Sequence, residues 1–226
     1  MAITIDHPAL LRLLQLVSPA LPVGAFSYSE GVETLVVQGY LSDRTTLQHW
    51  LTQELRYGGI RLEAAIAARA HQNLSNPDQL LYWNQWLTAS RDTAELRQQS
   101  GQMGRALVRL AQNLHPELQP IFDACGTPCN FAVAFGIVAA HWRIDRQTML
   151  LGYLQSWAAN LVGAAVKLVP LGQTDGQRCL LELMPELAAA AETMVQLPDN
   201  ELWVSGWGGA IASMHHETLY TRLFRS

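Results

Sequence analysis

Hydrophobic positions along the chain recur mainly at helical spacing, and no convincing run alternates between apolar and polar residues as a half-buried strand would. The first such segment covers about 8–17, and Pro19 and Pro22 end it because proline disfavours helical geometry in the preceding residue. The pattern predicts an all-α protein, a single-domain bundle of roughly nine to ten helices.

Capping residues indicate where the next two helices begin. Ser27 and Glu30 fit the S-x-x-E capping box, so a second helix is expected to start near Ser27 and to stop at Gly39. Asp43 is a suitable N-cap for a third helix that runs to about His71.

Glycine and proline divide the middle of the chain. Gly58-Gly59 is a weak point inside the third helix, and Asn76-Pro77 is a cap and first-turn pair that opens a fourth. The following helical segment continues to the break at His115-Pro116. Within it, Gly101 and Gly104 are expected to permit close contact with another helix.

Two strongly apolar segments follow. The run "FAVAFGIVAAHW" is too short to cross a bilayer and predicts a core helix. Residues 147–166 carry no charge and are long enough to span one, but Gln155, Ser156 and Asn160 lie within the segment, so we interpret it as a buried helix capped by Asp145. After the turn "LGQTDGQ", the segment "RCLLELMPELAAAAETMVQ" predicts the last bundle helix.

Near residue 200 the helical pattern gives way to a turn and a glycine-rich stretch. Glycines at 206, 208 and 209 precede a short helical segment that ends in "RLFRS". We therefore divide the chain into a bundle, residues 1–200, and a flexible, glycine-hinged partner-binding tail, residues 201–226. Deleting residues 211–226 is expected to leave the bundle folded.

Composition narrows the class of protein. Of the 226 residues, 49% are hydrophobic and 15% are charged, which is typical of a globular protein with surface available to a partner. The net charge of −4 and the absence of a basic tract argue against nucleic acid. Three cysteines and an N-terminus without a basic signal-peptide region favour the cytoplasm, with no membrane span.

Motifs for catalysis or metal binding are incomplete. "CGTPC" provides Cys125 and Cys129, which Cys179, His115 or His141 could complement, but a closed zinc site usually has a second ligand pair. "HHETLY" lacks the second histidine of H-E-x-x-H, and no phosphate-binding P-loop or G-x-S-x-G elbow occurs. We expect no catalytic, cofactor or metal site.

Four blocks of the sequence carry a family resemblance. "LLQLVSPALPVGAFSYSEGVE", "SRDTAELRQQSGQMGRAL", "NLVGAAVKLVPLGQTDGQ" and "HETLYTRLFRS" resemble, in the same order, the urease accessory protein family UreF. The resemblance implies an all-helical cytoplasmic chaperone that forms a homodimer, binds the accessory protein UreD (also called UreH) and engages the GTPase UreG. Nickel would then be handled by that complex and passed to apo-urease. Where the family often has a histidine before its "VAFG"-like run, this chain has Asn130 and Phe131, so no role for such a histidine is carried over.

The resemblance also suggests which residues contact partners. If the capping box forms, Phe26, Tyr28 and Glu33 are free to present an aromatic and acidic patch, whereas in the alternative the two aromatic residues pack inward. Two other classes stay open, namely an enzyme or carrier with a small apolar ligand between Phe131 and Pro170, and a direct metallochaperone. The candidate partner-binding residues are Phe26, Tyr28, Glu30, Glu33, Lys167, His216, Tyr220, Arg222, Leu223, Phe224 and Arg225.

Overall fold

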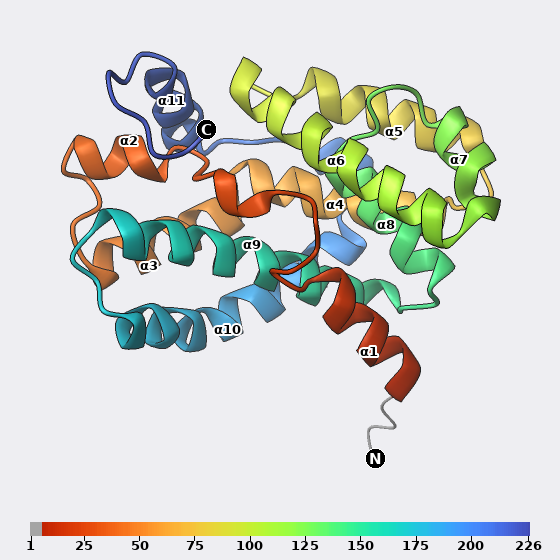
Figure 1. Ribbon diagram of the computed structural model, residues 1–226, viewed down its shortest axis with the longest axis horizontal. Helices are drawn as coiled ribbons and strands as arrows, with labels where there is room; N and C mark the ends of the chain where they lie inside the picture. Colours follow the sequence, from red (N-terminus) through yellow and green to blue (C-terminus); the bar gives the residue numbers. More distant parts are fainter. Residues whose placement is uncertain (1–5) are drawn as a thin grey trace.

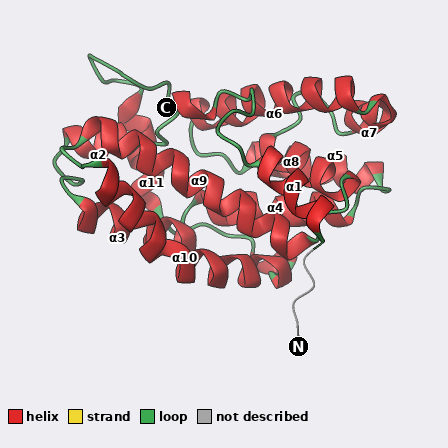
Figure 2. Cartoon of the chain, turned by 60° about the horizontal axis from the view of Figure 1, so that its bottom comes forward, coloured by secondary structure: helices red, strands yellow, loops and turns green. Residues whose placement is uncertain are grey.

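The computed structural model describes residues 6–226, and within them it is all-helical, as the periodicity predicts (Figures 1 and 2). Residues 1–5, part of the N-terminus in which we expect no signal peptide, lie outside the described residues. The α-helices are α1 (His7–Leu16), α2 (Val32–Val37), α3 (Arg44–Tyr57), α4 (Gly59–Gln72), α5 (Pro77–Ala89), α6 (Ala94–Leu114), α7 (Gln119–Ala124), α8 (Phe131–His141), α9 (Arg146–Leu168), α10 (Gln173–Gln196) and α11 (Trp207–His216). Short 3-10 helices η1 (Ala25–Ser27), η2 (Pro116–Leu118) and η3 (Asp199–Glu201) lie between them.

The helices pack around α4, which runs through the middle of the molecule (Figure 1). Its main neighbour is α8, and α5, α9, α10 and α3 also contact it. All eight residues from Ala132 to Ala139 on α8 are buried, because this helix lies between α4 and α6. The apolar run at 131–142 is therefore a core helix, as predicted.

The long apolar helix α9 is also part of the core. It is the one helix in residues 6–226 that is long and apolar enough to cross a membrane, and 61% of its apolar window is buried. It packs mainly on α10 and also contacts α4 and α2. The prediction of a buried helix for residues 147–166 is confirmed.

Most predicted helix starts are confirmed by hydrogen bonds at their caps. The side chain of Asp43 accepts from the Thr46 backbone N–H at 2.9 Å, and Asp145 caps α9 in the same way. The chain breaks between α3 and α4 at Gly58, and Asn76 caps α5. The last bundle helix starts earlier than predicted, since α10 includes most of the segment expected to be a turn.

The glycines of α6 permit a close contact as predicted, but the partner is the loop before α8 rather than another helix. A Cβ on Gly104 would lie 1.9 Å from the Cys129 carbonyl oxygen, so only glycine fits there. The loop before α8 consequently lies directly on the backbone of α6.

The capping box predicted at Ser27 is wrong. Ser27 ends the 3-10 helix η1, Glu30 has a left-handed backbone with φ 51°, and α2 begins only at Val32 after the N-cap Gly31. The physical reason is that the Glu30 carboxylate accepts hydrogen bonds from side chains of α6 and α9. It therefore cannot fold back onto the backbone of its own helix.

The expectation of a flexible C-terminal tail is also wrong. Helix α11 packs on α2, and His216, Phe224 and Ser226 are buried. Figure 1 shows the C-terminus beside α2 and α11. The glycines that suggested a hinge instead permit close packing, because a Cβ on Gly206 would lie 2.9 Å from the Tyr57 carbonyl oxygen.

Candidate partner-binding surface

The last residues of the chain are bound to the loop that precedes α2. The Arg225 backbone N–H donates to the Ser27 carbonyl oxygen at 2.8 Å. The Ser226 carbonyl oxygen accepts from the backbone N–H of Ser29 at 2.7 Å and from its hydroxyl at 2.6 Å. We call residues 27–33 and 216–226 together the C-terminal clamp.

Glu33 is the central acceptor of the clamp. Glu33 is only 5% exposed, and its carboxylate accepts from the backbone N–H groups of Leu223 at 2.7 Å and Phe224 at 3.0 Å. His216 Nε2 lies 3.2 Å from the same carboxylate. A buried carboxylate with several donors is well compensated, so Glu33 holds the chain end in place rather than facing a partner.

A second carboxylate completes the clamp from α6. Glu95 lies 2.7 Å from His216 Nδ1, and it also accepts from the Arg222 guanidinium at 3.0 Å. The fully buried His216 ring is therefore held between two carboxylates from different helices. This arrangement connects α11, α2 and α6.

Gly31 allows α11 to approach α2. Its φ is +87°, and a Cβ at this position would lie 2.9 Å from Ala212 Cβ and 3.2 Å from the Ser213 backbone nitrogen. Both its backbone conformation and the neighbouring helix therefore require glycine.

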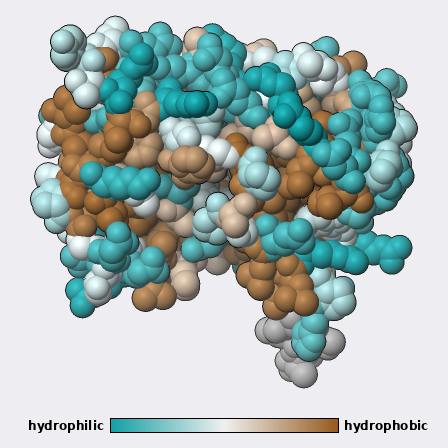
Figure 3. Space-filling view, in the orientation of Figure 1, coloured by the Kyte–Doolittle hydropathy of each residue, from teal (hydrophilic) through white to brown (hydrophobic). Residues whose placement is uncertain are grey.

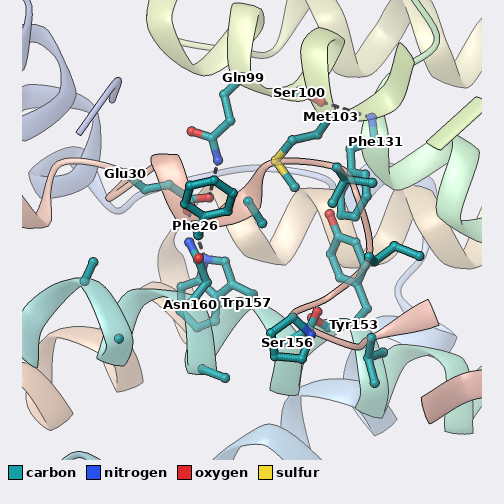
Figure 4. A pocket seen from close by; sticks show the side chains of 18 of the residues that line it. Phe26, Glu30, Gln99, Ser100, Met103, Phe131, Tyr153, Ser156, Trp157 and Asn160 are labelled. Atoms are coloured by element: carbon teal, nitrogen blue, oxygen red, sulfur yellow. Dashed lines mark hydrogen bonds between the residues drawn. The ribbon is translucent and has the colours of Figure 1, made fainter. Parts of the chain in front are cut away.

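A cavity of about 250 Å³ lies beside the clamp (Figure 4). Glu30 is in its wall, and its carboxylate accepts from Gln99 Nε2 at 2.6 Å and Trp157 Nε1 at 2.9 Å. Burial raises the pKa of Glu30 to about 7, and the negative charge of Glu63 adds to this effect. Phe26 is at the mouth of the cavity, where the residue is 70% exposed.

Further acidic groups lie behind Glu30. Glu63 pairs with Arg91 at 2.6 Å and accepts from the Tyr153 hydroxyl at 2.6 Å. Glu54, on α3, lines an adjacent smaller cavity, where burial first and the charge of Glu30 second raise its pKa to about 8. The interior beside the clamp thus contains more carboxylate than cationic side chains, which favours the protonated form of these carboxyl groups.

The predicted partner-binding residues fall into three groups. Glu30 faces the cavity, and the buried members of the set are Tyr28, Glu33, His216 and Phe224. The exposed members are Phe26, Lys167, Tyr220, Arg222, Leu223 and Arg225.

Tyr28 and Glu33 are therefore not free to form the aromatic and acidic patch that we expected. Tyr28 is 5% exposed and donates its hydroxyl to Gln102 Oε1 at 2.7 Å, so the inward-packing alternative holds for this residue. It does not hold for Phe26.

Contacts of the clamp connect several of the exposed members. Lys167 Nζ lies 5.5 Å from the centre of the Phe224 ring. Arg225 is bonded to the residue that follows Phe26, and its guanidinium lies 3.5 Å from Gln102 Oε1. We call the exposed residues Phe26, Lys167, Tyr220, Arg222, Leu223 and Arg225 the clamp surface.

Sequence reasoning did not find several residues that build the clamp. Glu95 lies in the first turn of α6, where an acidic residue is ordinary, and nothing in the sequence relates it to His216. Ser29 and Gln99 bind Ser226 through contacts that span more than 100 positions. No local pattern signals such pairs.

Within residues 6–226, no cysteine thiol joins the histidines in one cluster of potential metal ligands. Cys125 and Cys129 are buried and free. A hydrogen bond to the neighbouring Cys125 thiol, followed by burial, raises the pKa of Cys129 well above its usual range. His215 Nδ1 contacts Gln38 on the surface, while His216 is inside the clamp. The described residues therefore offer no thiol-based metal site in support of the metallochaperone alternative.

Further apolar surface lies away from the clamp surface. Figure 3 shows a brown area along α1, where Leu11 and Leu14 are 67% and 54% exposed. A second brown area lies on the left of the same view, on the side of α2 and α3. A chain with these faces has apolar area to bury against other molecules.

Comparison with known proteins connects this fold to a family. The family model described as UreF matches residues 41–184. A protein of Nostoc sp. named urease accessory protein UreF is 55% identical over 223 residues, covering 98% of this chain and 97% of the relative. Relatives of the same name from Trichormus variabilis and Alkalilimnicola ehrlichii are 52% and 42% identical, over 99% and 95% of both chains. This chain belongs to the UreF family of urease accessory proteins.

Proposed function

We propose that this protein is the scaffold of a nickel-loading complex: it binds a UreD/UreH-like accessory protein and, with it, engages a UreG-like GTPase that delivers nickel to apo-urease. As a member of a non-catalytic family, the chain acts in urease maturation, and it works with other urease accessory proteins. The enzyme alternative is therefore wrong. The carrier alternative has no support beyond the cavity itself.

The observation that carries the proposal is the clamp surface. Tyr220 is fully exposed and Leu223 is 64% exposed, although the Leu223 backbone N–H donates to the buried Glu33 carboxylate and Tyr220 lies between Leu223 and the buried His216. Aromatic, leucine and arginine side chains on an ordered segment can bind without a large ordering cost. We assign the C-terminal part of this surface, from Tyr220 to Arg225, to the UreD/UreH-like partner, and Phe26 to contact with the UreG-like GTPase.

Co-purification tests the assignment. Tyr220→Ala with Leu223→Ala should weaken binding to the UreD/UreH-like partner while the unfolding midpoint of the isolated chain stays unchanged, because neither side chain is buried. Tyr82→Ala, which alters a half-exposed tyrosine on α5, is the matched control. Wild-type binding by the double variant would exclude the clamp surface as the anchor.

The same proposal places the chain in the cytoplasm as a homodimer, with nickel bound by the complex and no cofactor of its own. The exposed leucines of α1 provide apolar surface that a second copy could cover. Sedimentation equilibrium of the isolated chain tests the dimer. A monomer at all concentrations would contradict it.

A further inference from the structure

Three potential metal ligands converge where α6, η2 and α8 meet. His115 is the C-cap of α6, Glu117 lies in η2, and His141 is the last residue of α8. Glu117 Oε1 lies 3.4 Å from His115 Nδ1 and 3.2 Å from His141 Nε2. Helix α7, which follows η2, is at the opposite end of the molecule from α2 and α11 (Figure 1).

This cluster is unusual within residues 6–226. No other group of three or more histidine, cysteine, aspartate or glutamate side chains there brings its ligand atoms so close, all within 4.8 Å of one another. The cysteines that sequence reasoning considered beside these histidines are not part of it.

The distances suit a transition-metal ion. In a tetrahedral site with bonds of about 2.0–2.2 Å, neighbouring ligand atoms lie roughly 3.3–3.6 Å apart. Both separations from Glu117 are close to that range, and all three ligand atoms lie within 4.8 Å of one another. Two imidazoles and one carboxylate favour ions of the cobalt-to-zinc series over calcium or magnesium.

The site is also accessible. The side chains of His115, Glu117 and His141 are 30%, 60% and 25% exposed, so an ion can enter from solvent. Three protein ligands leave at least one position for water or for a group from another molecule. Such a site binds and releases an ion more readily than a closed four-ligand site.

Trp142 provides a reporter for the ion. Its indole N–H donates to His115 Nε2 at 2.8 Å, which leaves the neutral ring with its proton on Nδ1, facing Glu117. An ion bound at Nδ1 requires that proton to be on Nε2 instead, so Trp142 would lose its acceptor. Metal binding is therefore coupled to the environment of one indole ring.

We propose that His115, Glu117 and His141 form a binding site for one divalent transition-metal ion. The proposal rests on the convergence of these three side chains and does not depend on the nickel-loading function. It replaces our expectation that the chain has no metal site.

Calorimetric titration of the untagged full-length chain with Ni²⁺ and, separately, Zn²⁺ tests the site. The wild type should bind one equivalent, and His141→Ala and Glu117→Gln should each weaken binding at least about tenfold. His49→Ala, which removes an exposed histidine from α3, is the matched control and should bind like the wild type. Circular dichroism checks that each variant is folded.

Tryptophan fluorescence distinguishes this site from adventitious binding. Zn²⁺ should change the emission of the wild type and of His49→Ala, but not that of Trp142→Phe or Glu117→Gln. Equal affinities in the wild type and both ligand variants would overturn the proposal. So would the absence of binding by the wild type, or a Zn²⁺ response that persists in Trp142→Phe.

Discussion

Replacing Glu33 by glutamine should open the C-terminal clamp. The native carboxylate accepts from two backbone N–H groups at 2.7 and 3.0 Å and lies 3.2 Å from His216 Nε2. Glutamine has the same shape but only one acceptor oxygen, and its NH₂ group faces donors. Buried N–H groups are thereby left without partners.

The expected size of the effect follows from these contacts. Hydrogen bonds to charged groups contribute about 1.5–3 kcal/mol each, and glutamine retains one of the bonds in a weaker, neutral form. We therefore expect Glu33→Gln to lower the free energy of clamp opening by about 2–4 kcal/mol. Amide exchange in residues 217–226 should then accelerate at least about 30-fold wherever it occurs through local opening.

Hydrogen exchange measured by mass spectrometry, together with urea unfolding, provides the assay. Exchange should increase in peptides from 217–226 and from 27–33, and remain at the wild-type rate in α8. Glu192→Gln, an exposed substitution on α10, is the control and should change stability by less than about 0.5 kcal/mol. Wild-type protection of the C-terminal peptides in Glu33→Gln would refute the role assigned to this carboxylate.

Three further predictions follow from the same structure. The free energy of unfolding should fall as pH rises from 4.5 towards about 8, because the pKa of Glu54 is raised from 4.5 to about 8 and the folded state holds the proton more tightly. The contribution of this residue is at most about 1.4 kcal/mol per pH unit, and Glu54→Gln should flatten the urea-derived profile; an unchanged slope would exclude Glu54 as its source. Gly31→Ala should destabilise the protein more than Gly39→Ala, since both have positive φ but only Gly31 faces α11; equal losses of thermal stability would show that the contact is unimportant. The isolated chain should show no tight GTP binding by calorimetry, because its sequence has no P-loop, and micromolar affinity would contradict the scaffold proposal.

The residues that form the core helices could be recognised from the sequence. The uncharged run that forms α9 and the short apolar run that forms α8 are buried. A helix that is apolar on nearly all its faces is stable in water only when other helices cover it. Asp43, Asn76 and Asp145 act as predicted caps, because capping depends on backbone groups only a few residues away. Such local features are encoded within a few turns of chain.

Tertiary structure decided where the polar residues near both chain ends point. Ser27 and Glu30 match a capping box, yet Glu30 is bonded to α6 and α9, so long-range partners outweigh a local cap. Likewise, the glycine-rich sequence of the C-terminal region is typical of a mobile tail. In the folded chain, however, Glu33 and Glu95 from two other helices contact His216 and hold this region in place. The sequence by itself determined the helical class, the core and the family resemblance. Only packing determined the clamp and the His115–Glu117–His141 cluster, because each joins residues that are distant along the chain and unrelated by any local pattern.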